Sequence, residues 1–344
     1  MHPILFEIFG YQVRSYSMAM ATGFVVGILL LRRRAVYEQF DVNFVLNSAL
    51  LTIFGTILGG RALFVITTWG ERFADKPWYE IFKVWEGGLV FYGGFFGSIL
   101  FVCLYAVVKR QNVLALMDLF APYAGLGLAI HRPFGCFMNG CCFGAPTGMP
   151  WGVHYPVDAY ATKFYGIGQA LHPTQLYMGL NGLFLFLVLR WYRDKKRSHG
   201  EVFGLLLSIY AINRFIIEFF RGDKIRGFVT GDAVWGLLVF IVGLTVFLLA
   251  KKLANKPLRN AGWLVILVGV VLAYLSLYSD TIHAGAETPF STSQFIGFYT
   301  LAAGLTIFLN ARLFGPPIQP EYGQPLAPGT LVEKVEAQAE AVAE

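Results

Sequence analysis

The apolar sequence VFGLLLSIYAINRFIIEFF, residues 202–220, decides the fold. Its length is close to the roughly 20 residues that a helix needs to cross a bilayer. Arg214 and Glu218 lie within it, although an ionisable side chain at membrane depth costs about 3 kcal/mol. Their i, i+4 spacing places both on one helix face, where they can pair, and Tyr210 lies on that face one turn earlier. The pair indicates either an ionic lock between helices or an anion-binding site tuned by an acid.

The composition of the whole chain agrees with a membrane protein. Of its 344 residues, 56% are hydrophobic and 14% are charged, whereas a soluble domain has roughly a quarter charged residues. This excess of apolar residues excludes a soluble enzyme. The 38 glycines and 32 phenylalanines are typical of packed membrane helices. The net charge of +6 is spread over short clusters between apolar runs, which encodes topology and does not indicate a nucleic-acid partner.

Apolar windows of similar length recur along the chain. They cover residues 15–31, 44–67, 89–108, 113–130, 174–189, 202–220, 233–250, 262–278 and 293–313. With the N-terminus outside, most Lys and Arg residues fall in inner segments, as the positive-inside rule requires. We therefore predict an all-α polytopic membrane protein with nine spans, its N-terminus outside and its C-terminus inside. Asp118 and Pro122 make window 113–130 the weakest, and we interpret it as partly re-entrant.

The segments outside these windows differ in character. Residues 1–14 mix apolar and polar types and are expected to lie at the membrane interface. Residues 131–173 form the longest non-apolar stretch, rich in aromatics and poor in charge, and are predicted to be an ordered outer loop. Residues 315–344 carry five prolines and then a Glu/Ala run, so we predict a disordered cytoplasmic tail.

The outer loop begins with HRPFGCFMNGCCFGAPT, residues 131–147. Arg132 and Asn139 are donors suited to a bound phosphate. The C-x4-C-C spacing of Cys136, Cys141 and Cys142 leaves three interpretations open: a metal site, a disulfide or reactive thiol, or small packing residues. The spacing matches no common zinc pattern, so packing is favoured and neither a metal nor another cofactor is expected.

Two further segments place isolated polar residues among glycines. In LGGRALF, residues 58–64, Arg61 either snorkels to the interface or contacts a phosphate. In FKVWEGGLVFYGGFFG, residues 82–97, the glycine pairs around Tyr92 thin one helix face and favour close helix packing or a lipid chain. Tyr16, in the first window, is positioned as an interfacial aromatic.

Taken in order, these segments resemble the prolipoprotein diacylglyceryl transferases of bacteria. The resemblance covers about residues 1–250 through the Tyr16 segment, LGGRALF, VWEGGLVFYGG, the glycine-rich signature, HPTQLY at residues 172–177 and GLLLSIYAINRFIIEFFR. It implies a seven-helix core over residues 15–250, with two additional helices over 262–314. It also implies a multi-pass protein of the bacterial inner membrane that moves the diacylglyceryl group of phosphatidylglycerol onto the lipobox cysteine thiol of preprolipoproteins and releases glycerol 1-phosphate.

The resemblance also assigns site residues. It implies catalytic roles for Tyr92, Arg132, Asn139, Arg214 and Glu218, and substrate contacts for Tyr16, Arg61, Gly144 and Tyr210. Tyr92 stands where the family has the histidine of its HGG motif, and we expect it to orient the thiol or the phosphate by hydrogen bonding.

The signature departs from the family pattern. Cys136 replaces its first Asn and Cys141 its Glu, Pro133 aligns with its Arg, and Met178 follows HPTQLY where the family often has Glu. The alternatives to an active transferase are a substrate-specialised or inactive paralogue, a lipid or anion carrier or channel, and a thiol oxidoreductase.

Overall fold

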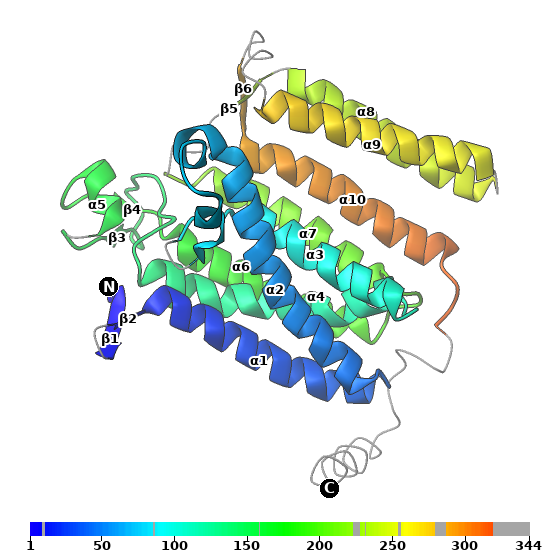
Figure 1. Cartoon of the computed structure of the whole chain (residues 1–344), viewed down its shortest axis with the longest axis horizontal. Helices are drawn as coiled ribbons and strands as arrows, with labels where there is room; N and C mark the ends of the chain where they lie inside the picture. The colour runs from blue at the N-terminus through cyan, green and yellow to red at the C-terminus, as the bar shows by residue number, and fades with distance from the viewer. Residues whose placement is uncertain are drawn as a thin grey trace, which may run out of the picture. The chain divides into compact units, whose positions relative to one another are not determined.

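The computed structural model describes residues 1–8, 11–84, 87–157, 159–222, 228–230, 232–253, 256–278 and 287–318 (Figure 1). Contacts within the chain divide it into two compact units. The first unit comprises residues 1–27 and 120–318, and the second contains residues 28–119. The candidate site described below lies in the first unit.

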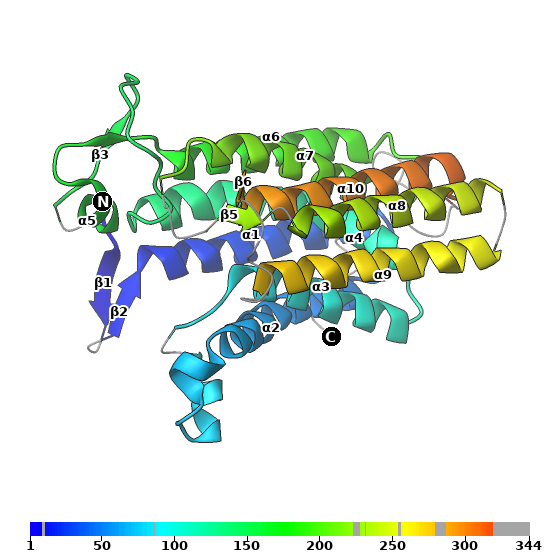
Figure 2. The same ribbon diagram turned by 90° about the horizontal axis from the view of Figure 1, so that it is seen from above.

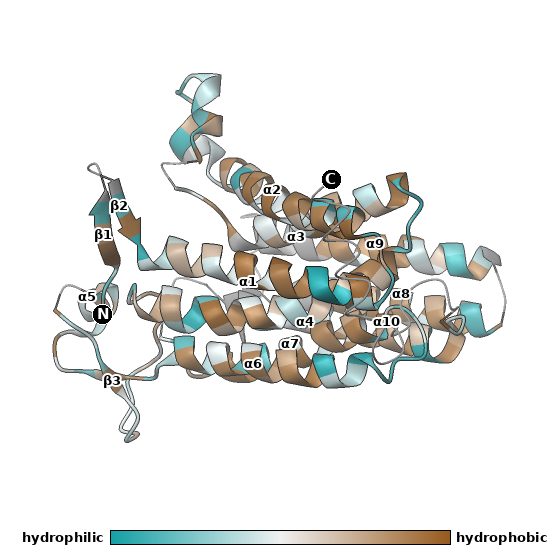
Figure 3. Cartoon of the chain, turned by 90° about the horizontal axis from the view of Figure 1, so that it is seen from below, coloured by the Kyte–Doolittle hydropathy of each residue, from teal (hydrophilic) through white to brown (hydrophobic). Residues whose placement is uncertain are grey.

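Long helices dominate the described residues, and each predicted apolar window coincides with one of them. They are α1 (Ser15–Tyr37), α2 (Val42–Thr67), α3 (Phe91–Val108), α4 (Val113–His131), α6 (Thr174–Arg193), α7 (Glu201–Glu218), α8 (Asp232–Lys252), α9 (Lys256–Tyr278) and α10 (Thr292–Phe314). Hydrophobic residues follow the helices along their length (Figure 3). Among the described residues, four helical stretches are long and apolar enough to cross a bilayer: Ser15–Tyr37, Val42–Thr67, Val113–Phe137 and Ser293–Phe314. The chain is therefore a mainly helical integral membrane protein.

The weakest window, residues 113–130, forms a helix. Helix α4 is continuous through Pro122 and leads directly into a π-helical turn, η4 (Arg132–Phe137). Asn112 caps its first turn, since its side-chain oxygen accepts hydrogen bonds from the backbone nitrogens of Leu114 and Ala115 at 3.0 and 3.2 Å. The structure therefore shows one uninterrupted helix over this window, and its partly re-entrant course in the membrane stays a prediction.

In the second unit, glycines bring α2 and α3 into backbone contact. A Cβ atom added to Gly97 would meet the carbonyl oxygen of Gly55, and one added to Gly93 would meet that of Gly59. Only glycine allows so close an approach. The predicted close packing through the glycine pairs is thus confirmed, and it joins the second and third apolar windows. Between these helices lie two short turns, η1 (Trp69–Phe73) and η2 (Trp78–Phe82).

The N-terminal segment folds as a β-hairpin. Strand β1 (Ile4–Ile8) pairs antiparallel with β2 (Tyr11–Arg14), with Ile4 opposite Arg14. The hairpin leads straight into α1, and the backbone nitrogen of Ser15 donates to the carbonyl of Pro3 at 3.0 Å. Its position at the membrane interface stays a prediction.

The segment predicted to be an ordered outer loop does have its own core. After η4 it forms β3 (Val153–His154), α5 (Tyr160–Tyr165) and β4 (Ala170–Leu171), and β3 pairs antiparallel with β4. Phe143, which is fully buried, packs with Tyr155, Ala161 and Leu171. The loop therefore carries a small aromatic core that fixes the cysteine segment, and its order is confirmed.

The C-terminal helices pack on the rest of the first unit. Figure 2 shows α6, α7, α8 and α10 running side by side. Close contact between α7 and α10 depends on two glycines, because a Cβ on Gly204 would meet the backbone of Phe308 and one on Gly304 would meet Ser208. Strand β5 (Phe228–Thr230) pairs with β6 (Glu287–Ser291), which leads into α10. Of the predicted disordered tail, residues 319–344 lie outside the described residues.

Candidate active site

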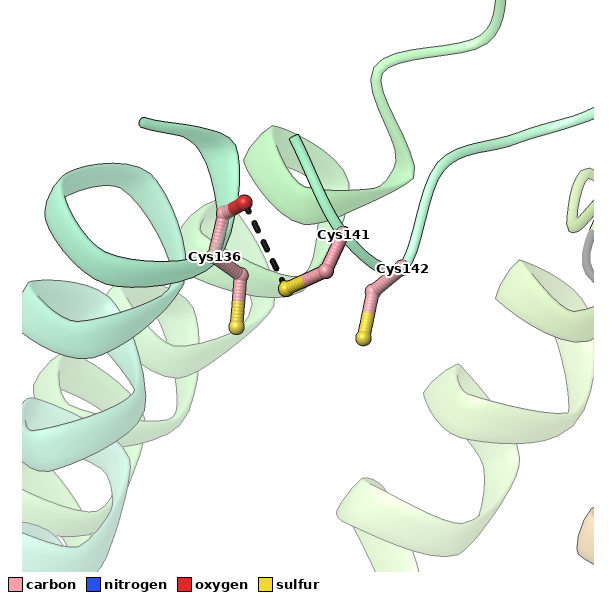
Figure 4. Close-up of side chains that lie close together, drawn as sticks. All are labelled: Cys136, Cys141 and Cys142. Atoms are coloured by element: carbon pink, nitrogen blue, oxygen red, sulfur yellow. Dashed lines mark hydrogen bonds between the residues drawn. The ribbon is translucent and has the colours of Figure 1, made fainter. Parts of the chain in front are cut away.

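Three cysteine sulfurs meet where η4 ends. The Sγ atoms of Cys136, Cys141 and Cys142 all lie within 4.8 Å of one another, and Cys141 Sγ lies between the other two in the view (Figure 4). Cys136 is buried, and the Cys141 thiol donates a hydrogen bond to the carbonyl oxygen of Cys136 at 3.6 Å. Cys142 has a left-handed backbone, with φ of 59°, a conformation that costs a non-glycine residue about 1 kcal/mol. The linear spacing gave no indication of this cluster, because the turn at Gly140 and the backbone of Cys142 create it.

The start of α6 holds this turn in place. Thr174 Oγ1 donates to the Cys142 carbonyl, and Gln175 Nε2 donates to the Cys141 carbonyl, each at 2.7 Å. Tyr155 in turn donates to Gln175 Oε1 at 3.0 Å. Burial raises the pKa of the Tyr155 phenol to about 12, so it remains a neutral donor. The HPTQLY segment therefore positions the cysteines, a role that the sequence interpretation missed.

Positive charge borders the cluster. Arg132 Nη1 lies 3.9 Å from Cys136 Sγ, and Arg132 Nε is buried without a hydrogen-bond partner among the described residues. Hydrogen bonds from the Cys136 and Cys141 thiols, together with the charges of Arg132 and Arg221, lower the pKa of the Cys142 thiol. A guanidinium with a buried donor atom that the described residues leave unused is suited to an anionic ligand.

The other side of Cys136 meets an aromatic pair. His131 Nδ1 is 4.0 Å from Cys136 Sγ, and the His131 ring meets Tyr16 edge to face, with centroids 4.6 Å apart. The Nε2 atom of His131 is also buried, with no hydrogen-bond partner in the part of the chain that the structure describes. The structure thus brings the predicted Tyr16 and Arg132 to the start of the same turn, where Tyr16 contacts His131.

The predicted Arg214–Glu218 pair is present at the end of α7. The two side chains form a salt bridge, and Arg214 is 9% exposed. Glu218 has two further partners that the sequence interpretation missed. Arg221 Nε lies 3.9 Å from Glu218 Oε2, and Ser291 Oγ donates to Oε1 at 2.9 Å. Two guanidiniums therefore share the Glu218 carboxylate.

Gly144 connects the cysteine segment to the end of α7. Its backbone nitrogen donates to the His172 carbonyl at 2.9 Å, and it forms a β-bridge with Arg221. A Cβ here would collide with the backbone of His172 and with the carbonyl oxygen of Phe220. Gly144 is thus a point of close backbone approach, and its contact with substrate stays a prediction.

A small cavity and a larger groove lie beside the residues of the candidate site. Asn139 lines a cavity of about 170 Å³ together with Met1, Pro3, Met138, Gly140, Pro156, Ala159, Tyr160 and Lys163. A larger groove of about 620 Å³ runs along α6 and α7. It is lined by Met149, Trp151, His172, Tyr177, Leu180, Asn181, Phe184, Asn213, Ile216, Ile217 and Phe220. The walls of this groove are mainly apolar. Its polar groups are the side chains of Asn181 and Asn213, which share a hydrogen bond of 2.7 Å, and the polar atoms of Trp151, His172 and Tyr177.

The remaining predicted residues have other surroundings. In the second unit, Arg61 donates to the carbonyls of Ile81 and Gly87 at 2.7 and 2.8 Å and to that of Glu80 at 2.9 Å. Arg61 therefore holds a loop together and does not snorkel. Tyr92 lies in the first turn of α3, but its side chain is outside the described residues. Tyr210 is half-buried on α7, one turn before Arg214.

Comparison with known proteins identifies a family whose sequence model the chain matches. Residues 3–249 match the sequence model of the family described as prolipoprotein diacylglyceryl transferase. The chain is 36% identical over 250 residues to the phosphatidylglycerol–prolipoprotein diacylglyceryl transferase of Clostridium tetani (strain Massachusetts / E88), covering 72% of this chain and 97% of the relative. It is 34% identical to enzyme 2 of that name from Clostridium perfringens (strain 13 / Type A), covering 74% and 98%. It is 32% identical to the enzyme from Vibrio atlanticus (strain LGP32), covering 73% and 91%.

Proposed function

This chain belongs to the prolipoprotein diacylglyceryl transferase family, and we propose that it transfers diacylglyceryl from phosphatidylglycerol to the lipobox cysteine of preprolipoproteins. The substrate sulfur forms a bond to the sn-3 carbon of the diacylglyceryl group. The bond from that carbon to the phosphate oxygen breaks, and glycerol 1-phosphate leaves. The thiol proton passes to the leaving phosphate or to water.

The observation that carries the proposal is the Nε donor of Arg132, which is buried and has no hydrogen-bond partner among the described residues. A phosphate monoester gains charge as it leaves, and fixed cations that follow this charge accelerate the step. Arg132 would take one phosphate oxygen, and Arg214, kept in place by Glu218, would take another. Arg221 adds to the field that neutralises the leaving group. Asn139 and Tyr92 would orient phosphate and thiol, and Tyr16, Arg61, Gly144 and Tyr210 would contact the substrates, as their match to the family motifs implies.

The groove along α6 and α7 suits the lipid part of the donor. Its walls are apolar, and its volume of about 620 Å³ accommodates an acyl chain. The Trp151 indole donates to the Tyr177 hydroxyl at 2.7 Å at the polar end of the groove. We assign this groove to one acyl chain of phosphatidylglycerol.

The topology proposed with this function has nine spans, an outer N-terminus and an inner C-terminus in the bacterial inner membrane. Positive charge in the inner loops supports it. This arrangement puts residues 131–173 outside, where exported preprolipoproteins emerge. Residues 15–250 would form the transferase core, with α9 and α10 added to it.

Complementation tests the proposal. Cells depleted of their own diacylglyceryl transferase should grow when this chain is expressed, and equal amounts of Arg214→Ala should fail to rescue them. Arg33→Ala, which removes an exposed arginine outside the site, is the matched control and should rescue. Failure of the well-expressed wild type would instead favour a substrate-specialised or inactive paralogue, or a lipid or anion carrier. Because the relatives named above are all transferases, a thiol oxidoreductase is disfavoured.

A further inference from the structure

We propose that Cys136, Cys141 and Cys142 bind one Zn2+ ion through three thiolates. Their sulfurs lie within 4.8 Å of one another and come from a single turn. Zinc–thiolate bonds of about 2.3 Å in a tetrahedron place ligand sulfurs about 3.8 Å apart. The cluster therefore needs only a small contraction to meet the geometry that zinc prefers.

The surroundings of the turn fit a metal site better than a packing role. Thr174 and Gln175 fix the carbonyls of Cys142 and Cys141 by hydrogen bonds of 2.7 Å, which is the outer support that orients metal ligands. The backbone of Cys142 is left-handed, with φ of 59°, a strained conformation that a small packing residue does not require. Small packing residues need neither feature.

Charge also agrees with zinc. Three thiolates and one Zn2+ ion carry a net charge of −1, and the guanidinium of Arg132, 3.9 Å from Cys136 Sγ, balances it. Soft thiolate ligands favour zinc over the hard cations magnesium and calcium.

The cluster leaves one coordination position for a substrate. Among the described residues, the group of mutually close ligand atoms has three members, and His131, whose Nδ1 lies 4.0 Å from Cys136 Sγ, is not one of them. Three protein ligands with an open fourth position are typical of catalytic zinc sites. Resting on the proposed function, we assign the fourth position to the lipobox thiol. On binding zinc the thiol loses its proton to water, and the bound sulfur then attacks the sn-3 carbon as described above.

Metal analysis of the full-length protein in detergent tests the site independently of transfer. After incubation with Zn2+ and removal of the excess, wild type should hold one zinc per chain, whereas Cys136→Ser/Cys141→Ser/Cys142→Ser should hold none. Cys103→Ser removes the cysteine outside the cluster and should keep the zinc. Cobalt replacing zinc should give the near-ultraviolet bands of cobalt–thiolate bonds. A single variant, Cys142→Ser, which keeps the other two ligands, should bind zinc at least about tenfold more weakly.

The outcomes separate the site from the function. Well-folded wild type that holds no zinc and gives no cobalt–thiolate bands, or a triple variant that binds zinc as wild type does, overturns the site. Diacylglyceryl transfer by metal-free protein at the rate of the zinc form overturns the assigned role of the metal and leaves the proposed function intact. Zinc bound as expected in a protein that shows no transfer supports the site and contradicts the proposed function.

Discussion

Replacing Arg214 by alanine tests the chemical role of the buried charges. The substitution leaves Glu218 with the Ser291 hydroxyl at 2.9 Å and Arg221 at 3.9 Å. Removing one partner of a buried ion pair usually costs 3–5 kcal/mol, and these remaining contacts place the cost at about 3 kcal/mol of stability. If Arg214 also contacts the leaving phosphate, the lost transition-state stabilisation is a further 2.7–4 kcal/mol, or roughly 100- to 1,000-fold in rate.

The initial rate of transfer to a lipobox peptide, with phosphatidylglycerol as donor, measures the second effect. Thermal unfolding in detergent measures the first. Arg214→Lys keeps the charge and should recover part of the rate, while Arg214→Ala/Glu218→Ala should recover stability without recovering rate. A correctly inserted Arg214→Ala protein with full transfer activity would refute the reasoning, because the pair would then be an ionic lock between helices.

Substitutions at three further positions separate positioning from chemistry. Tyr155→Phe should lower the free energy of unfolding by about 1–3 kcal/mol, because Gln175 loses a buried donor; thermal melts that match wild type would contradict this. Ser291 lies outside the family match, and Ser291→Ala removes its hydrogen bond to the charged Glu218. The substitution should lower the free energy of unfolding by about 1.5–3 kcal/mol. An unchanged melting temperature would show that the start of α10 does not support the Arg214–Glu218 pair. Tyr92→Phe should slow transfer modestly, and Tyr92→His should be tolerated. If Tyr92→Phe is inactive and the transfer rate of the wild type rises between pH 6 and 10 with a lowered phenol pKa, Tyr92 is the base.

The long helices were predictable because length and hydrophobicity suffice to define them. Each apolar window became a helix, and several helices extend into polar flanks, as α1 does through Arg34 to Tyr37. Windows based on hydrophobicity end at the first charges, whereas backbone hydrogen bonding continues past them. The N-terminal hairpin was not predicted, since its strands are short and the sequence shows no clear alternation.

The site was predictable only where the pattern is local. The Arg214–Glu218 pair follows from helical spacing alone. The partners of Arg61 are backbone carbonyls 19 to 27 residues away, which carry no residue-type signal. The cysteine cluster depends on left-handed backbone at Gly140 and Cys142. From the sequence, Gly140 predicts a turn but not the position of the cysteines, and nothing in the sequence predicts the left-handed conformation of Cys142.

The most direct test is transfer by the purified protein in vesicles containing phosphatidylglycerol, given a lipobox peptide with a single cysteine. The mass of the peptide should rise by one diacylglyceryl group, and one glycerol 1-phosphate should appear for each modified peptide. A peptide in which serine replaces the cysteine should stay unmodified. Folded protein that leaves the cysteine peptide unmodified and releases no glycerol 1-phosphate would contradict the account.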